Sequence, residues 1–362
     1  MPRNRTGARS RVRKLVLAGI TVAVTASVAT VTGVSMAAVT PNNTAVTPLS
    51  RGSGAVDLVW VGDQGRIHFA SQAPGSDDWF TGFLNRGVAA PNTKVTGVSR
   101  HPGRLDLFAV GTDHKVYTAF LDEGMDRPGT VIWHGWFPLG GNVHDDSSVH
   151  VASLNRDTMD IFTLDTQNRP VTMRWTAQDG WGAWQRVDAS GEDFHAATNG
   201  AEVTAVAFNG EIHLFTSKRR VISGPTYTDP PITKRLTTTH GWSAWEELRG
   251  QDLAFGSELA PVVSGGSVFV MAATRVSPNV NPDAIRVARF NGREWAKPMT
   301  KVLDGVPERD TSVHVVARSA GLLDAFAVGT DSQVYTAAWN STDGWGGWWP
   351  LGGEAGGKTS VT

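Results

Sequence analysis

The sequence contains no cysteine, which excludes disulfide bonds, thiolate metal sites and cysteine nucleophiles. Tyrosine is scarce, with 3 residues against 14 tryptophans, and charged residues make up only 19% of the 362 residues. The chain also lacks the 3.6-residue periodicity of amphipathic helices beyond its N-terminal segment. Apolar residues reach 40%, which is enough to build a core and excludes disorder of the whole chain. The composition therefore indicates a folded protein without helices.

The short motifs of common catalytic and metal sites are missing as well. We find no His-Glu-x-x-His, no Gly-x-Ser-x-Gly elbow, no phosphate-binding loop and no EF-hand loop. Four aspartates recur along the chain, but glycoside hydrolysis needs two carboxylates at one place. Hydrogen bonding between strands is the better interpretation of these residues, Asp57, Asp106, Asp160 and Asp324. We therefore predict no enzymatic activity, no catalytic residue, no metal site and no cofactor.

The first 38 residues are typical of a secretory signal peptide. Six basic residues and no acidic residue precede Leu15, and residues 15–50 carry no charge. An apolar run over 15–34 leads to Ser-Met-Ala-Ala at 35–38, the small residues that a signal peptidase reads. We predict cleavage between Ala37 and Val39, a short linker at 39–45, and a secreted, extracellular protein. An uncleaved membrane anchor is the alternative, since about 20 apolar residues can span a bilayer.

Removal of this segment shifts the charge balance. The remaining chain has 27 basic and 34 acidic residues, a net charge of −7. Such a protein has no electrostatic reason to bind nucleic acid or an anionic membrane. We predict neither nucleic-acid binding nor membrane insertion after signal cleavage.

The rest of the chain repeats one pattern six times. Residues 104–113 (RLDLFAVGTD) return at 322–331 (LLDAFAVGTD), and each copy leads to a tryptophan pair and a Leu-Gly-Gly stop at 133–141 and 345–353. Weaker copies fill the intervals. Equivalent positions are 49 to 56 residues apart in the sequence, at Asp57, Asp106, Asp160, His213, Val268 and Asp324.

Each repeat is predicted to form four short strands joined by tight turns. Four strands in roughly 50 residues is the pattern of a β-propeller blade. The predicted fold is therefore all-β, a single β-propeller over residues 46–362 with six four-stranded blades of about 53 residues each. Seven blades is the alternative count. A β-solenoid is the second choice of architecture, although its repeats are normally shorter.

Two segments compete for the innermost strand of the first repeat. Residues 45–50 align with 94–99, and the C-terminal residues 359–362 copy the start of the corresponding strand at 311–314. We predict that the N-terminal segment forms the strand and that the C-terminal residues lie against the first blade as a latch.

This repeat, with its L-D-L-F-A-V-G-T-D run and its W-x-x-W-x-x-L-G-G ending, resembles the bacterial propeller lectins related to the fucose-binding lectin of Photorhabdus. It is similar, more distantly, to tectonins and fungal fucose lectins. The resemblance covers roughly residues 46–357 and implies a propeller that binds glycans, with fucose or related sugars as the candidates, in pockets between blades. Two features depart from the family: its best-known members have seven blades, and an arginine often stands where this chain has Val61, Val110 and Val328.

The tryptophan pairs supply the candidate binding residues. An aromatic ring can stack on the apolar face of a sugar while polar groups bind its hydroxyls. The first tryptophan of each pair follows polar or glycine-rich residues, so we take Trp133, Trp181, Trp242 and Trp345 as candidate sugar platforms. Candidate hydroxyl partners are Asp179, Asn340 and Asp343, for which turn formation is the alternative role. The second members, Trp136, Trp184, Trp245 and Trp348, are predicted to pack between blades.

Two classes of function follow from these residues. The first is a secreted, non-enzymatic, lectin-like propeller that binds glycans or glycoconjugates through several weak sites. The second is a secreted scaffold for protein interaction whose sugar sites have degenerated. A glycan hydrolase or lyase that uses the central channel is a third. Exposed tryptophans beside arginine or aspartate in several clefts would favour the first class, and clefts closed by apolar side chains would favour the second.

Overall fold

The protein is described here by a computed structural model. It describes residues 46–51, 55–84, 89–90, 93–123, 131–144, 147–188, 202–218, 220–223, 226–237, 241–249, 252–254, 257–275, 284–303 and 311–352. The predicted signal peptide (1–38), the linker (39–45) and the proposed latch (359–362) lie outside these residues.

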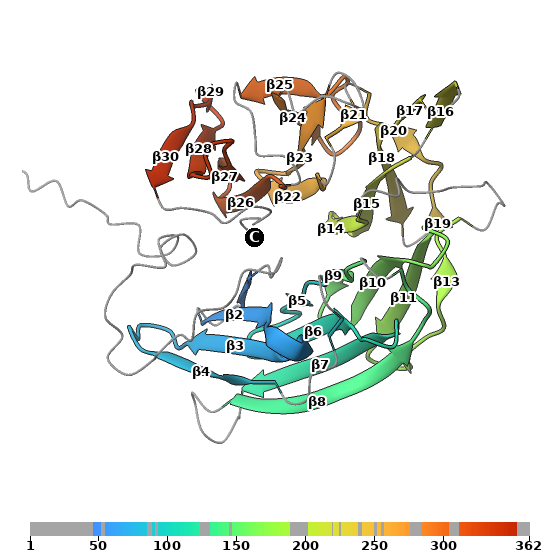
Figure 1. The fold of residues 1–362 in the computed structure, drawn as a ribbon, viewed down its shortest axis with the longest axis vertical. Coiled ribbons are helices and arrows are strands. Elements are labelled where there is room, and N and C mark those ends of the chain that lie inside the picture. The colour runs from blue at the N-terminus through green and yellow to red at the C-terminus, as the bar shows by residue number, and fades with distance from the viewer. Residues whose placement is uncertain are drawn as a thin grey trace, which may run out of the picture.

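Six antiparallel sheets follow one another in chain order around a central axis, from blue to red in Figure 1. The prediction of an all-β propeller with six four-stranded blades is confirmed. Among the described residues, no helix is both long and apolar enough to cross a membrane.

The first three blades contain the N-terminal half of the propeller. Blade 1 consists of β1 (Thr47–Ser50), β2 (Val56–Val61), β3 (Ile67–Gln72) and β4 (Trp79–Phe83), with a 3-10 turn at Asp63–Gly65. Blade 2 consists of β5 (Thr96–Val98), β6 (Arg104–Val110), β7 (Val116–Glu123) and β8 (Val131–Gly140). Blade 3 consists of β9 (His150–Asn155), β10 (Thr158–Leu164), β11 (Pro170–Thr176) and an outer strand split into β12 (Gly180–Trp181) and β13 (Gln185–Arg186).

The last three blades follow the same plan. Blade 4 consists of β14 (Thr204–Phe208), β15 (Glu211–Ser217), β18 (Pro231–Thr237), β19 (Gly241–Trp242) and β20 (Glu246–Glu247), with a separate hairpin of β16 (Arg220–Ser223) and β17 (Thr226–Thr228). Blade 5 consists of β21 (Asp252–Leu253), β22 (Ala260–Ser264), β23 (Ser267–Arg275), β24 (Ala284–Phe290) and β25 (Thr300–Leu303). Blade 6 consists of β26 (His314–Ser319), β27 (Leu322–Val328), β28 (Val334–Asn340), β29 (Gly344–Trp345) and β30 (Trp349–Gly352).

The innermost strand of blade 1 comes from the N-terminal segment, as predicted. Thr47 to Ser50 pair with Val59 to Val56 in antiparallel register. Pro48, which has no N–H to donate, is tolerated because β1 is an edge strand of its sheet.

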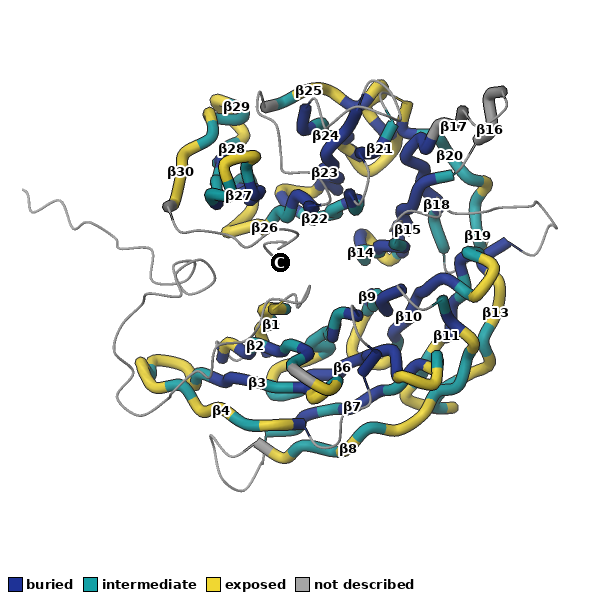
Figure 2. Tube along the Cα trace, viewed as in Figure 1, coloured by how far each residue is buried: buried dark blue, intermediate teal, exposed yellow. Residues whose placement is uncertain are grey.

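The hydrophobic core is divided among the junctions between blades. Five clusters of buried side chains each combine residues of two successive blades, from blades 1 and 2 to blades 5 and 6. Five of the second strands, β6, β10, β15, β23 and β27, are buried along almost their whole length, whereas β2 is buried only at alternate residues. Exposed residues concentrate on outer strands such as β4 and β8 (Figure 2). In blades 2 to 5, neighbouring blades cover both faces of the second strand, so its sequence is a continuous apolar run rather than an alternating one.

The second tryptophan of each pair links its blade to the preceding one. The indole Nε1 of Trp136 donates to the Leu84 carbonyl at 2.8 Å, and that of Trp184 donates to the Leu139 carbonyl at 3.0 Å. In blade 4 the partner is a side chain, because Trp245 Nε1 donates to Asp188 Oδ2 at 2.7 Å. These contacts confirm the predicted packing role of these tryptophans.

We expect Trp184→Phe to lower the free energy of unfolding by about 1 kcal/mol or more, since an aromatic ring remains but it is smaller and the Leu139 carbonyl loses its donor. Urea denaturation would measure the change, with Trp349→Phe on the exposed outer strand β30 as the control. Equal effects of the two substitutions would show that the hydrogen bond contributes nothing.

Candidate functional site

A cleft of about 440 Å³ opens between blades 2 and 3. It combines a large apolar wall with a charged end. Its lining residues are Arg100, Arg104, Asp106, Thr118, Phe120, Phe137, Pro138, Leu139, Met159, Met173, Trp175, Trp181 and Gly182.

The apolar wall is built around two tryptophans of blade 3. Trp175 on β11 and Trp181 on β12 are direct partners across the two strands, so alternation along each strand presents both rings on the same face. The Trp181 ring meets Phe108 of blade 2 edge-on, with 5.8 Å between ring centroids. The sequence thus places two large aromatic rings side by side in the cleft.

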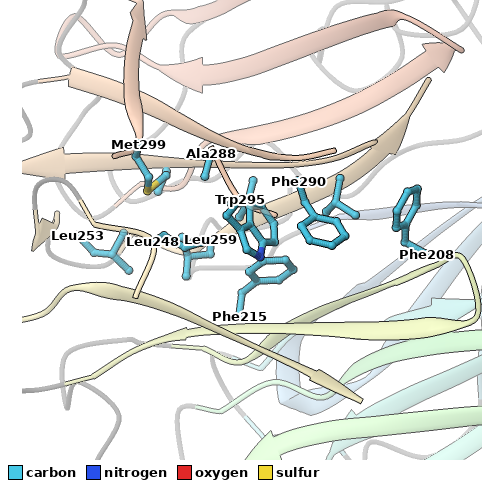
Figure 3. Close-up of a cluster of buried hydrophobic side chains, with 12 residues drawn as sticks. Phe208, Phe215, Leu248, Leu253, Leu259, Ala288, Phe290, Trp295 and Met299 are labelled. Atoms are coloured by element: carbon cyan, nitrogen blue, oxygen red, sulfur yellow. The ribbon is translucent and has the colours of Figure 1, made fainter. Parts of the chain in front are cut away.

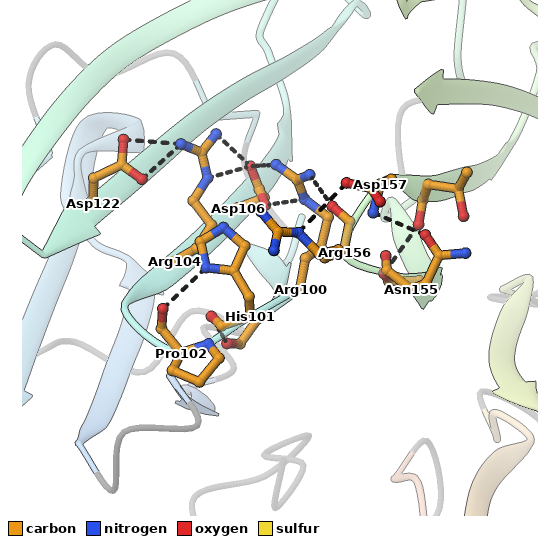
Figure 4. A network of polar contacts seen from close by, with 12 residues as sticks. Arg100, His101, Pro102, Arg104, Asp106, Asp122, Asn155, Arg156 and Asp157 are labelled. Carbon is orange, nitrogen blue, oxygen red and sulfur yellow. Dashed lines mark hydrogen bonds and ion pairs between the residues drawn. The ribbon is translucent and has the colours of Figure 1, made fainter. Parts of the chain in front are cut away.

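The charged end is organised by Asp106, which is buried on β6. Arg100 donates from Nε to Asp106 Oδ2 at 2.7 Å, and Arg104 donates from Nη2 to Asp106 Oδ1 at 2.9 Å. Arg104 also donates from Nη1 to both carboxylate oxygens of Asp122, at 2.8 and 2.9 Å. Figure 4 shows the two guanidinium groups converging on Asp106 from opposite sides.

Each guanidinium also lies over an aromatic ring of the cleft. The Cζ atom of Arg100 is 3.9 Å from the centroid of the Trp175 ring, and that of Arg104 is 3.8 Å from the Phe120 ring. Arg100 further donates from Nη1 to the Arg156 carbonyl of blade 3 at 2.8 Å. These contacts hold the arginines in place without a ligand.

The electrostatics of this end are balanced. Burial lowers the pKa of Arg104, but its hydrogen bonds to Asp106 and Asp122 outweigh that effect and leave the pKa raised. Two guanidinium groups face two carboxylates, so the end as a whole is close to neutral. A guanidinium has five N–H groups, and Arg100 uses three nitrogens in one bond each, which leaves donors for a ligand.

Of the four tryptophans predicted as sugar platforms, Trp181 lies in this cleft. The other three occupy the equivalent position of their own blades and are half-buried: Trp133 packs on Phe69 and Trp242 on Phe162, with centroids 5.4 and 6.1 Å apart. Trp345 packs against the cluster between blades 5 and 6. The structure therefore distributes these rings one to a junction and does not bring them together.

The three predicted hydroxyl partners lie in turns. The backbone N–H of Asp179 donates to Thr176 Oγ1 at 2.9 Å. The N–H of Asp343 donates to Asn340 Oδ1 at 2.7 Å, and Asn340 Nδ2 donates to Asp343 Oδ2 at 3.1 Å. These contacts are the turn chemistry that was the alternative role for these residues, and none of the three lines the cleft.

The sequence reasoning missed the charged end of the cleft. A signal was present, because Arg51, Arg100 and Arg318 each precede a recurring aspartate by six residues. Each of these arginines forms an ion pair with that aspartate. Blade 3 lacks an arginine at this position, and Arg174 on β11 pairs with Asp160 instead.

Other junctions between blades carry different contacts from the charged end of the cleft between blades 2 and 3. Between blades 1 and 2, Glu123 accepts a 2.7 Å hydrogen bond from Arg51 Nη1. Between blades 4 and 5, aromatic rings including Phe215, Phe290 and Trp295 pack together (Figure 3).

Blade 5 also differs from the alignment made from the sequence. By strand register the residue equivalent to the recurring aspartates is Phe269, which faces Arg289, and not Val268. The Phe269 ring packs on Trp339 of blade 6, with centroids 5.0 Å apart. This junction therefore carries an aromatic contact where blade 2 carries its carboxylate.

No protein-family model matches the chain, and no curated protein sequence is significantly similar to it. Solved structures with the same fold include a lectin from Burkholderia pseudomallei, with 16% sequence identity and a TM-score of 0.69 over 86% of this chain and 85% of that one. The SapL1 lectin, solved in complex with α-methyl fucoside, shares 15% identity with a TM-score of 0.52 over 87% and 97% of the two chains. An α-L-arabinanase from Penicillium chrysogenum, complexed with arabinobiose, shares 9% identity with a TM-score of 0.55 over 84% and 95%. These similarities establish the propeller fold.

Proposed function

We propose that the protein is a non-enzymatic, carbohydrate-binding propeller and that the cleft between blades 2 and 3 is its binding site. The observation that carries this proposal is the combination, in one open cleft, of Trp175 and Trp181 with Arg100, Arg104 and Asp106. Apolar walls with a few fixed polar groups are the usual composition of small-ligand sites.

The chemistry of the cleft suits a neutral sugar. A pyranose ring can lie against the tryptophans, where its C–H face replaces water on an apolar surface. Arg100 can donate to ring hydroxyls. Asp106 already accepts four hydrogen bonds from Arg100 and Arg104, so its role is to hold both guanidinium groups in place. Because the arginines already face two carboxylates, the cleft offers little net attraction for an acidic sugar. Fucose or a related sugar is our candidate, supported by the fold shared with a lectin solved with α-methyl fucoside.

Secretion is part of the proposal and rests on the N-terminal sequence alone. A basic start, an apolar run and a small-residue cleavage pattern within residues 1–38 support export. A glycan on another cell surface or in the surrounding medium is then the partner that the protein would meet.

Two other functions have a specific observation in their favour. The filled junctions, such as the one with Phe269 and Trp339, favour a protein-binding scaffold with degenerate sugar sites. The propeller shared with an arabinanase, together with the carboxylates of Glu202 and Glu258 near the axis, favours a hydrolase. Both carboxylates pair with Lys94, however, which leaves neither in the free state that a catalytic pair requires.

The experiment that tests the proposal is a glycan array with residues 39–362, followed by calorimetry with the best ligand. We expect binding of neutral glycans and a loss of about tenfold or more in affinity for Trp181→Ala. The matched control is Trp345→Ala, which changes the equivalent residue of blade 6. Thermal unfolding of both variants checks that each is folded.

Three outcomes would contradict the proposal. Equal loss of binding in the two variants would place the site elsewhere. An array without any bound glycan would favour the scaffold. Release of reducing sugar from arabinan or from a bound glycan would favour the hydrolase.

A further inference from the structure

A second polar cluster lies at the axis of the propeller. Its members come from equivalent positions in blades 2 to 6. The first set stands two residues before the innermost strand of each blade, and the second set is the first residue of that strand. Lys94, Ser148, Glu202, Glu258 and Ser312 form the first set, and Thr96, His150, Thr204, Ala260 and His314 form the second. The repeat thus stacks two sets of side chains around the axis, with one residue from each of these five blades in each set.

The charged members of these sets touch one another. Lys94 of blade 2 pairs with Glu258 of blade 5, and its Nζ lies 3.5 Å from Glu202 Oε2 of blade 4. Blades 2 and 5 are not neighbours, so this contact crosses the axis. His150 Nε2 of blade 3 lies 2.8 Å from Glu202 Oε2, and Ser148 Oγ donates to Glu202 Oε1 at 3.0 Å. We call Lys94, His150, Glu202, Glu258 and His314 the axial cluster.

The axial cluster has more negative than positive side chains. Two carboxylates face one ammonium, and the side chains of Lys94, Glu202 and Glu258 are between 9% and 16% exposed. A further positive charge at this point would reduce the repulsion between the two carboxylates.

The cluster also offers nitrogen ligands. One ligand atom each of His150, Glu202 and Glu258 lies within 4.8 Å of the other two. In blade 6, His314 Nε2 is buried and has no hydrogen-bond partner. Neutral imidazole is a common metal ligand.

We propose that the axial cluster binds one divalent ion of the zinc class through His150, Glu202 and Glu258, and that the ion displaces the ammonium of Lys94. Two ligand atoms of a tetrahedral ion are about 3.4 Å apart at bond lengths of about 2.1 Å, so the three ligand atoms, which lie within 4.8 Å of one another, must move inward to close the site. Imidazole nitrogen with two carboxylate oxygens suits zinc or cobalt, whereas calcium takes six or more oxygens.

The position of the site predicts how a bound ion would affect the stability of the propeller. The three ligands come from blades 3, 4 and 5, and His314 of blade 6 is the candidate for a fourth. An ion bound there would tie successive blades together at the axis and stabilise the folded form by mass action. This inference is independent of sugar binding in the cleft.

The test uses metal-free residues 39–362 with zinc chloride in calorimetry and thermal unfolding, and cobalt chloride for an absorption spectrum. We expect one ion per chain, a raised melting temperature and a cobalt spectrum typical of nitrogen and oxygen ligands. His150→Gln should weaken zinc binding about tenfold or more. The matched control is His101→Gln, which changes an exposed histidine in the turn between β5 and β6. It should leave zinc binding and the melting temperature unchanged.

Lys94→Met separates this proposal from a purely structural ion pair. Removal of the competing ammonium should strengthen zinc binding about tenfold or more, since the ion no longer has to displace it. If this variant is unstable without metal, zinc should restore its melting temperature. The proposal is wrong if neither the unchanged protein nor Lys94→Met binds zinc more tightly than His150→Gln does.

Discussion

Replacement of Asp57 by alanine is expected to destabilise the protein by about 3 kcal/mol, the lower end of the usual effect of breaking a buried ion pair, since Arg51 keeps Glu123 as a second partner. Arg51 donates from Nε to Asp57 Oδ2 at 2.7 Å and from Nη2 to Ser71 Oγ at 2.9 Å. Ser71 Oγ in turn donates to Asp57 Oδ1 at 2.7 Å. The side chains of Arg51 and Asp57 are only 5% and 0% exposed, so water cannot replace the lost carboxylate.

The same pair should be replaceable as a unit. Burial raises the pKa of Asp57, and its hydrogen bonds to Ser71 and Arg51 only partly offset that effect. The ion pair therefore does not fully compensate the desolvation of the carboxylate. We expect the double variant Arg51→Met with Asp57→Leu to recover much of the stability lost by Asp57→Ala.

Urea denaturation at pH 7 measures these differences, with the exposed Asp113→Ala as the control. Glu123, which accepts a hydrogen bond from Arg51, is itself unchanged in all of these variants. A loss below about 1 kcal/mol for Asp57→Ala would show that water or a backbone shift satisfies Arg51.

The periodicity of the chain was sufficient to predict the fold. The run 104–110 is largely apolar on both faces, and the structure places it between blades 1 and 3. The tryptophan pairs also predicted the packing between blades, because Trp136 and Trp184 donate hydrogen bonds to the preceding blade at equivalent places. Blades 2 and 3 make this bond in the same way, so the repeat itself records it.

The candidate site was predictable only in part, because it depends on departures from the repeat. Trp181 shares a position with Trp133 and Trp345, yet it lines an open cleft because Trp175 and the arginine pair stand beside it. The axial contact between Lys94 and Glu258 joins residues that are 164 positions apart. Such contacts follow from the closing curvature of the ring, which no local pattern reports.

Lowering the pH from 7 to 4 is expected to destabilise the protein, in part because of His213. The substitution His213→Phe should remove the share of this pH-dependent loss of stability that comes from His213. His213 replaces the recurring aspartate in blade 4 and is fully buried. Its ring lies among Phe208, Phe290 and Trp295, and neither ring nitrogen has a hydrogen-bond partner. Burial, and to a lesser extent the charge of Arg235, lowers the pKa of His213 from 6.5 to about 4.

The direction of the effect follows from the protons bound in each state. Between pH 6.5 and 4 the unfolded chain binds a proton at His213 and the folded protein does not, so stability falls as the pH falls. The loss is complete below the folded-state pKa and amounts to about 3 kcal/mol for a difference of about 2.5 pKa units. His213→Phe has no proton to bind in either state and keeps an aromatic ring among aromatic neighbours.

Denaturation curves of the unchanged protein and of His213→Phe between pH 7 and 4 give the test. The stability of the variant relative to the unchanged protein should rise by about 3 kcal/mol across this range. His101→Phe, at an exposed histidine, should follow the unchanged protein at every pH. Parallel curves for His213→Phe and the unchanged protein would mean that His213 finds a partner for its proton in the folded state. The carboxylate of Glu211, whose Oε2 lies 3.8 Å from His213 Nε2, would be that partner, and Glu211→Gln would then restore the pH dependence.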